Sequence, residues 1–80
     1  MRISVTEDHI KKGRKREPRF CPVAIAVRER LKLSEYQVDV GNRIWIKDFP
    51  VEIPHAVNRF VSDFDNGRPV EPFEFDLDYA

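Results

Sequence analysis

Two segments of the chain repeat apolar residues every three or four positions, which is the spacing of an amphipathic helix. In residues 54–67, "PHAVNRFVSDFDNG", one stripe is formed by Val57, Phe60, Val61 and Phe64. In residues 21–33, "CPVAIAVRERLKL", Pro22 suits the first helical position because its missing N–H costs nothing there. The first half of this segment is apolar almost all round, so we expect it to lie deep in the core.

Apolar and polar residues alternate in three further segments, which predicts strands. Residues 2–5 form a short strand, and residues 73–79 form a strand with an acidic outer face. Residues 36–48 are typical of a hairpin, with a two-residue turn expected at Gly41-Asn42. Trp45 falls opposite the isoleucines of this hairpin, and two positions stay open for it: beneath a helix or at an interface.

A short helix over residues 6–13 completes the pattern, with Thr6 as its N-cap and Gly13 just past its C-terminus. The order is therefore β, short α, α, β, β, α, β. It predicts an α+β fold with two main helices on one face of a small, mostly antiparallel sheet. Residues 1–80 should form a single compact domain with one core, made of Val23, Val27, Leu31, Val57, Phe60, Val61, Phe64, Phe73, Phe75 and Leu77.

The single cysteine of this 80-residue chain excludes an internal disulfide, so packing or self-association must stabilise the fold. A lone thiol suits a reducing compartment. No apolar run approaches the roughly 20 residues that span a bilayer, and the N-terminus has no hydrophobic leader segment. We therefore expect a cytoplasmic protein without a membrane partner.

Charge is distributed unevenly, although the formal net charge is zero. Residues 1–35 carry ten Lys and Arg against five Asp and Glu, and residues 36–80 carry four against nine. Such a chain can attract a polyanion at one end, or its ends can pair within one chain or between copies. Together with a terminal strand suited to a sheet edge, this favours a homo-oligomer.

The densest charge lies in "KKGRKREPRF", residues 11–20, which we call the basic segment. Its cations can neutralise phosphates and its aromatic ring offers a stacking face. Two alternatives are a solvated loop and a segment neutralised by the chain's own acids. We predict a ligand-binding surface that consists of Lys11, Lys12, Arg14, Lys15, Arg16, Arg19 and Phe20.

No catalytic or metal-binding signature accompanies this segment. Cys21, His9 and His55 share no metal-ligand spacing, and both histidines are expected at exposed helix positions. Cys21 falls at a helix N-cap, where a thiolate is favoured, but no base or oxyanion site can be named beside it. We expect a buried, structural cysteine, no cofactor and no enzymatic activity.

Three stretches carry more specific motifs: "ISVTEDHIKKG", "CPVAIAVRE" and "RFVSDFDNGRPVEPFEFDL". They resemble a family of small proteins encoded by tailed bacteriophages and prophages, with a CP-[IV]-A-[IL]-A helix start and a closing FDxGxPVxPFxF segment. The resemblance covers nearly the whole chain. It rests on Val5, Thr6, His9, Ile10 and Gly13, on Cys21–Ala26, and on Phe64, Asp65, Gly67 and Pro69–Phe75.

The resemblance supplies no catalytic residue, and what it implies is a context. Small phage proteins without an active site act by binding, either to block a host enzyme or defence protein or to sequester a nucleotide signal. We therefore expect a non-catalytic counter-defence or host-takeover protein in the host cytoplasm, which binds a host protein or a phosphate-bearing nucleotide ligand. The alternative is an accessory protein that binds nucleic acid through residues 11–19.

Overall fold

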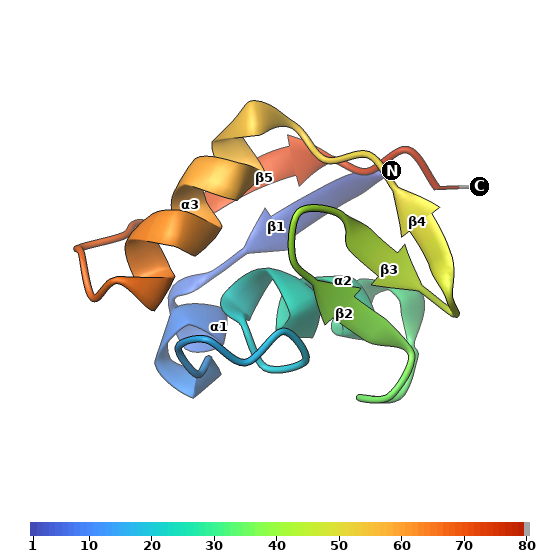
Figure 1. The fold of residues 1–80 in the computed structure, drawn as a ribbon, viewed down its shortest axis with the longest axis horizontal. Coiled ribbons are helices and arrows are strands. Elements are labelled where there is room, and N and C mark those ends of the chain that lie inside the picture. Colours follow the sequence, from blue (N-terminus) through green and yellow to red (C-terminus); the bar gives the residue numbers. More distant parts are fainter. Residues whose placement is uncertain (80) are drawn as a thin grey trace.

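A computed structural model describes residues 1–79 of the chain. Three helices and five strands lie within these residues, and Figure 1 shows their arrangement. In chain order they are β1 (Arg2–Val5), α1 (Glu7–Lys12), α2 (Pro22–Leu31), β2 (Val38–Val40), β3 (Ile44–Ile46), β4 (Phe49–Val51), α3 (His55–Asp65) and β5 (Phe73–Asp76). The α+β class and the order of elements are confirmed, with β4 as an additional strand.

The strands form two separate antiparallel sheets rather than the single sheet that the sequence predicts. One joins the ends of the chain by pairing β1 with β5, with Ile3 opposite Phe75. The other is a meander in the order β2-β3-β4. Helix α2 contacts both β1 and β2 and therefore links the two sheets.

The composition of α2 explains this central position. Its buried residues, Pro22, Val23, Ala24, Ala26 and Val27, surround the first half of the helix rather than forming one stripe. A helix that is apolar on several sides is stable only when several elements cover it. The two main helices therefore do not share one face of one sheet: α2 lies between β1 and β2, and α3 packs Phe60 against Phe73 at the start of β5, with ring centroids 4.7 Å apart.

The predicted turn of the hairpin is also different in the structure. The loop between β2 and β3 contains residues 41–43, because Val40 pairs with Ile44, and Gly41 does not adopt positive φ. Two residues at positive φ, Lys47 at 51° and Asp48 at 69°, instead connect β3 to β4. A two-residue hairpin turn of the primed type requires such backbone angles.

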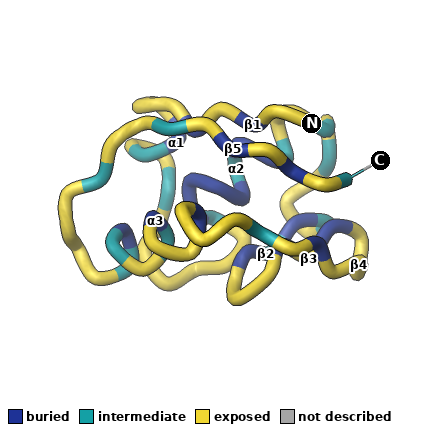
Figure 2. The backbone as a smooth tube through the Cα atoms, turned by 90° about the horizontal axis from the view of Figure 1, so that it is seen from above, coloured by how far each residue is buried: buried dark blue, intermediate teal, exposed yellow. Residues whose placement is uncertain are grey.

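One apolar core joins the two sheets to α2 and α3, and its buried positions are dark in Figure 2. Seven of the ten predicted core residues are buried, and Leu31, Val61 and Phe73 are partly buried against them. Phe60 contacts a second ring besides Phe73, since its centroid lies 6.3 Å from that of Phe64. The predicted core is therefore confirmed, and β1, β2 and β3 extend it.

Candidate functional site

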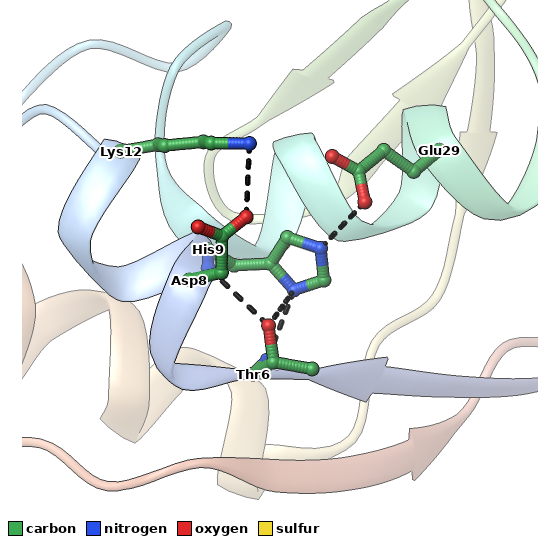
Figure 3. A network of polar contacts seen from close by, with 5 residues as sticks. All are labelled: Thr6, Asp8, His9, Lys12 and Glu29. Carbon is green, nitrogen blue, oxygen red and sulfur yellow. Dashed lines mark hydrogen bonds and ion pairs between the residues drawn. The ribbon is translucent and has the colours of Figure 1, made fainter.

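The basic segment begins on α1, where Lys12 is already paired. Its Nζ lies 2.9 Å from Asp8 Oδ2, one helical turn earlier (Figure 3). This hydrogen bond raises the pKa of Lys12 and lowers that of Asp8. Lys11 is exposed, and no carboxylate among residues 1–79 lies within ion-pair distance of its amine.

His9, on the same helix, is buried, whereas the sequence predicts an exposed position for it. Its side chain lies between β1 and α2: the Thr6 amide donates to Nδ1 at 2.9 Å, and Nε2 lies 2.8 Å from Glu29 Oε1 (Figure 3). Because a backbone N–H only donates, Nδ1 accepts and Nε2 carries the proton that faces Glu29. His9 therefore fixes α1 to α2 and has a structural role.

The middle of the basic segment folds around Phe20. The Arg14 N–H donates to the Phe20 carbonyl oxygen at 2.8 Å, and the Arg14 guanidinium lies 5.0 Å from the centre of the Phe20 ring. The guanidinium of Arg28, from α2, lies 5.6 Å from the same ring and donates to the carbonyl oxygen of Arg19. Cation–π contacts of this kind occupy the ring. Phe20 is therefore a structural contact of the loop rather than the free stacking face that the sequence predicts.

The second half of the segment is attached to two other elements. Arg19 Nε lies 3.4 Å from Asp39 Oδ1 of β2, and the neighbouring Pro18 carbonyl oxygen accepts from the Val40 N–H at 3.0 Å. The Arg16 N–H donates to Asp65 Oδ1 of α3 at 2.9 Å. The segment is thus an ordered bridge between β2 and α3, although residues 14–19 are exposed to solvent.

Acids of the chain neutralise only half of the predicted cations. Lys12 pairs with Asp8, Arg14 with Glu17 and Arg19 with Asp39. For the side chains of Lys11, Lys15 and Arg16, no such partner exists within residues 1–79. The acids of β5 have a different role, since Glu74 and Asp76 both bind Arg2 across the first sheet.

A cleft of about 590 Å³ lies beside the bridge formed by the basic segment. One wall is residues 16–18 with Cys21, a second is residues 40–42 at the tip of the β2–β3 hairpin, and the third is α3. Helix α3 contributes side chains from one face, namely Asn58, Val61, Ser62 and Asp65. Three segments that are distant in the sequence meet here, so no local pattern could have predicted this cleft.

Cys21 lies at the inner end of this cleft, as the N-cap of α2. The residue is 2% exposed, and burial raises the pKa of its thiol above the ordinary value. A raised pKa keeps the thiol protonated at neutral pH, where a nucleophilic cysteine would need a thiolate. These observations agree with the structural role expected for Cys21.

This burial yields a testable prediction. At pH 7.5 the native protein should react with a disulfide reagent such as Ellman's reagent at least about tenfold more slowly than the denatured protein, because burial removes both access and thiolate. The rate should rise as the pH passes above the ordinary thiol range, since the folded-state pKa is raised. Rapid labelling of the folded protein at neutral pH would restore a chemical role for Cys21.

A second surface feature lies on the β2-β3-β4 meander. Trp45 is 42% exposed and sits on the outer face, in register with Asp39 on one side and Pro50 on the other. Tyr36 and Phe49 are 69% and 72% exposed. Tyr36 precedes β2 and Phe49 follows the Lys47-Asp48 turn, so the register places both at the same end of the sheet. Paired residues share a side of a sheet, so Trp45 lies on the outer side with Asp39 and Pro50, whereas Phe49, opposite Ile46, and Tyr36, two residues before Val38, fall on the other side. All three rings are nevertheless exposed, and we use the name aromatic face for Tyr36, Trp45 and Phe49 together.

The position of Trp45, which the sequence left open, is therefore the surface. Tyr36 alternates with Val38 and Val40 in the sequence, yet only the two valines are buried. The guanidinium of Arg19 lies 5.1 Å from the centre of the Tyr36 ring, which connects the aromatic face to the basic segment.

Comparison with known proteins adds no relative: no family model matches the chain, and neither a curated protein nor a solved structure is significantly similar to it. Among residues 1–79, no three His, Cys, Asp or Glu side chains lie close enough together to share a metal ion. The helices in the same residues are all too short or too polar to cross a bilayer.

Proposed function

We propose that this chain is a small, non-catalytic binding protein of the phage type that blocks a host protein through the aromatic face. The observation that supports this most is the exposure of three large aromatic side chains in and beside one small sheet. Fully burying such a ring removes about 150–250 Å² of surface from water. Grouped exposed rings are a feature of protein interaction sites, and a partner that covered these rings would gain that burial.

The surroundings of the aromatic face also suit a protein partner. Trp, Tyr and Arg are the residues that most often contribute large binding energies in interfaces, and Arg19 already lies over Tyr36. The adjacent charges have both signs, with Arg43 near Glu52 at 4.0 Å and Lys47 beside Asp48. A mixed polar rim around an aromatic centre is typical of specific protein interfaces.

The test is a Trp45→Ala, Phe49→Ala double variant of the full chain. Binding to the host protein that the parent chain recovers from cell extract should weaken at least about 30-fold, which corresponds to about 2 kcal/mol. Phe49 is 72% exposed and Trp45 42%, so the double variant should stay folded at the temperature of the binding assay, which a melting curve checks. Arg59→Ala, an exposed change on α3, is the matched control, and equal retention of the partner by both variants would refute the proposal.

A second copy of the chain is the other possible cover for this face, and homo-oligomerisation remains part of the proposal. Pairing of two copies through β5 is less favourable. Two antiparallel β5 strands centred on Phe75 would place Glu74 opposite Asp76 of the other copy, and like charges directly opposite each other destabilise a sheet. Trp45 is the only tryptophan, so its emission reports the state of the face directly. A concentration-dependent blue shift, with a dimer in sedimentation, would identify a second copy as the occupant.

A phosphate-bearing ligand is the second candidate, favoured by the three cations that have no acidic partner within residues 1–79, Lys11, Lys15 and Arg16. If that ligand were nucleic acid, its affinity would fall with salt at a log–log slope of up to about −3, given roughly −0.9 per neutralised phosphate. The chain has a formal net charge of zero, and a compact ligand needs fewer cations for binding than a polymer of phosphates does. We therefore prefer a small phosphate-bearing molecule to a polymer.

A further inference from the structure

We propose that the cleft between the basic segment, the β2–β3 hairpin and α3 binds a nucleotide. The base would lie in the cleft, a ribose hydroxyl would face the Asp65 carboxylate, and the phosphate would contact Lys15 and Arg16 at the rim. This inference rests on the second candidate above, the phosphate-bearing ligand, and is independent of the aromatic face.

The size and walls of the cleft fit this class of ligand. Its volume of about 590 Å³ falls within the roughly 300–1,000 Å³ of small-molecule sites. Pro18, Val40 and Val61 supply apolar walls from three different segments. A flat base can pack against such walls, whereas a bare inorganic anion would gain nothing from them.

The polar groups of the cleft are available to a ligand. The side chains of Asn42, Asn58 and Ser62 line it, and within residues 1–79 none of the three makes a hydrogen bond to another residue. A carboxamide both donates and accepts, which is the pairing that the edge of a nucleobase requires. Two carboxamides and the Ser62 hydroxyl, from the β2–β3 loop and α3, line one space.

The charges around the cleft distinguish a nucleotide from phosphate alone. Asp65 uses Oδ1 for the Arg16 N–H, and a carboxylate has further acceptor sites, which suit the hydroxyl groups of a ribose. Arg16 and Lys15 supply positive charge beside it: Lys15 Nζ would lie 3.4 Å from a methyl group placed on Gly67, just past α3. The carboxylates of Glu17 and Asp65 line the cleft and disfavour an anion placed inside it. A ligand that keeps its phosphate at the rim and brings hydroxyl groups to Asp65 therefore fits the charges better than free phosphate does.

The test is equilibrium dialysis or calorimetry of the full chain with AMP, GMP, adenosine and inorganic phosphate as probes. At least one nucleotide should bind about tenfold or more tightly than adenosine and than phosphate. Asn58→Leu, which keeps the size of the side chain, and Arg16→Gln should each weaken that binding about tenfold or more. Arg59→Gln is the matched control for the lost charge, and its binding should equal that of the parent.

The outcomes separate the proposals. If AMP and phosphate bind equally and Asn58→Leu has no effect, the basic segment binds anions and the nucleotide cleft is wrong. If none of the probes binds, both the nucleotide cleft and the proposal of a phosphate-bearing ligand are wrong. Trp45→Ala should leave nucleotide binding unchanged, and a loss in that variant would also overturn the assignment. Unchanged melting temperatures of Asn58→Leu and Arg16→Gln ensure that a loss reflects the cleft and not the fold.

Discussion

The Phe60→Ala variant should lose about 3–5 kcal/mol of unfolding free energy, because truncating a buried aromatic ring removes its burial and leaves a cavity. Phe60 is only 7% exposed and contacts the rings of Phe64 and Phe73. Small domains have a total of about 5–15 kcal/mol, so much of this protein's stability depends on one side chain. Thermal and urea unfolding followed by circular dichroism measure the loss.

Arg59→Ala provides the comparison, since it changes an exposed neighbour on the same helix and should alter stability by no more than about 0.5 kcal/mol. If Phe60→Ala and Arg59→Ala melt at similar temperatures, the packing of α3 against the first sheet is not as described.

The helices were predictable because their signals are local. The stripe that ends in Phe64 predicted a helix over residues 54–67, and α3 covers His55–Asp65. The all-round apolar start of α2 likewise predicted a deeply buried helix, and Val23, Ala24 and Val27 are fully buried. Periodicity reports which face of an element is buried, and the core residues followed from it.

The arrangement of the strands was not predictable because pairing is a non-local property. Alternation marks residues 2–5 and 73–79 as strands, but it does not indicate that they pair with each other in a sheet that has only these two strands within residues 1–79. Strand β4 was missed for a local reason: it has only three residues, includes Pro50, and follows a turn without glycine. Each of these features normally argues against a hairpin strand.

The number of cations in the basic segment follows directly from the sequence, whereas the residues that these cations contact could not be predicted from it. Arg19 meets Asp39 and the Arg16 amide meets Asp65, across separations of 20 and 49 residues. Lys12, Arg14 and Arg19 therefore pair with acids of the chain, while Lys11, Lys15 and Arg16 have no acidic partner within residues 1–79. That these cations bind a ligand stays a prediction. The cleft and the aromatic face both depend on such long-range placement.

Several residues that carry the resemblance to phage proteins have structural roles in this chain. Thr6 caps α1 and His9 bridges Thr6 to Glu29. Gly13 was expected just past the C-terminus of α1, a position where glycine commonly adopts a left-handed conformation, but its φ is −68° and its ψ is 154°. Its backbone angles are therefore open to other residues, and the reason for glycine must lie in its surroundings.

Gly13→Ala tests that reason, and we expect it to lose about 1–3 kcal/mol of unfolding free energy through overpacking. A Cβ at this position would lie 2.6 Å from Cγ and 2.7 Å from Cδ of Pro22. Pro22 is fully buried in the first turn of α2, and its ring is rigid, so it cannot move away without shifting the helix. The loss should exceed the roughly 0.4–1 kcal/mol that a glycine-to-alanine change gains by restricting the unfolded chain.

Gly41→Ala is the matched control, since nothing lies within 4 Å of its added Cβ and its φ is not positive. That variant should be neutral or stabilised by up to about 1 kcal/mol. Combining Gly13→Ala with Pro22→Ala removes the ring atoms that clash, so the double variant should lose less than the sum of the two single changes. Additive losses, or equal melting temperatures for Gly13→Ala and Gly41→Ala, would show that the contact between Gly13 and Pro22 does not determine the choice of glycine.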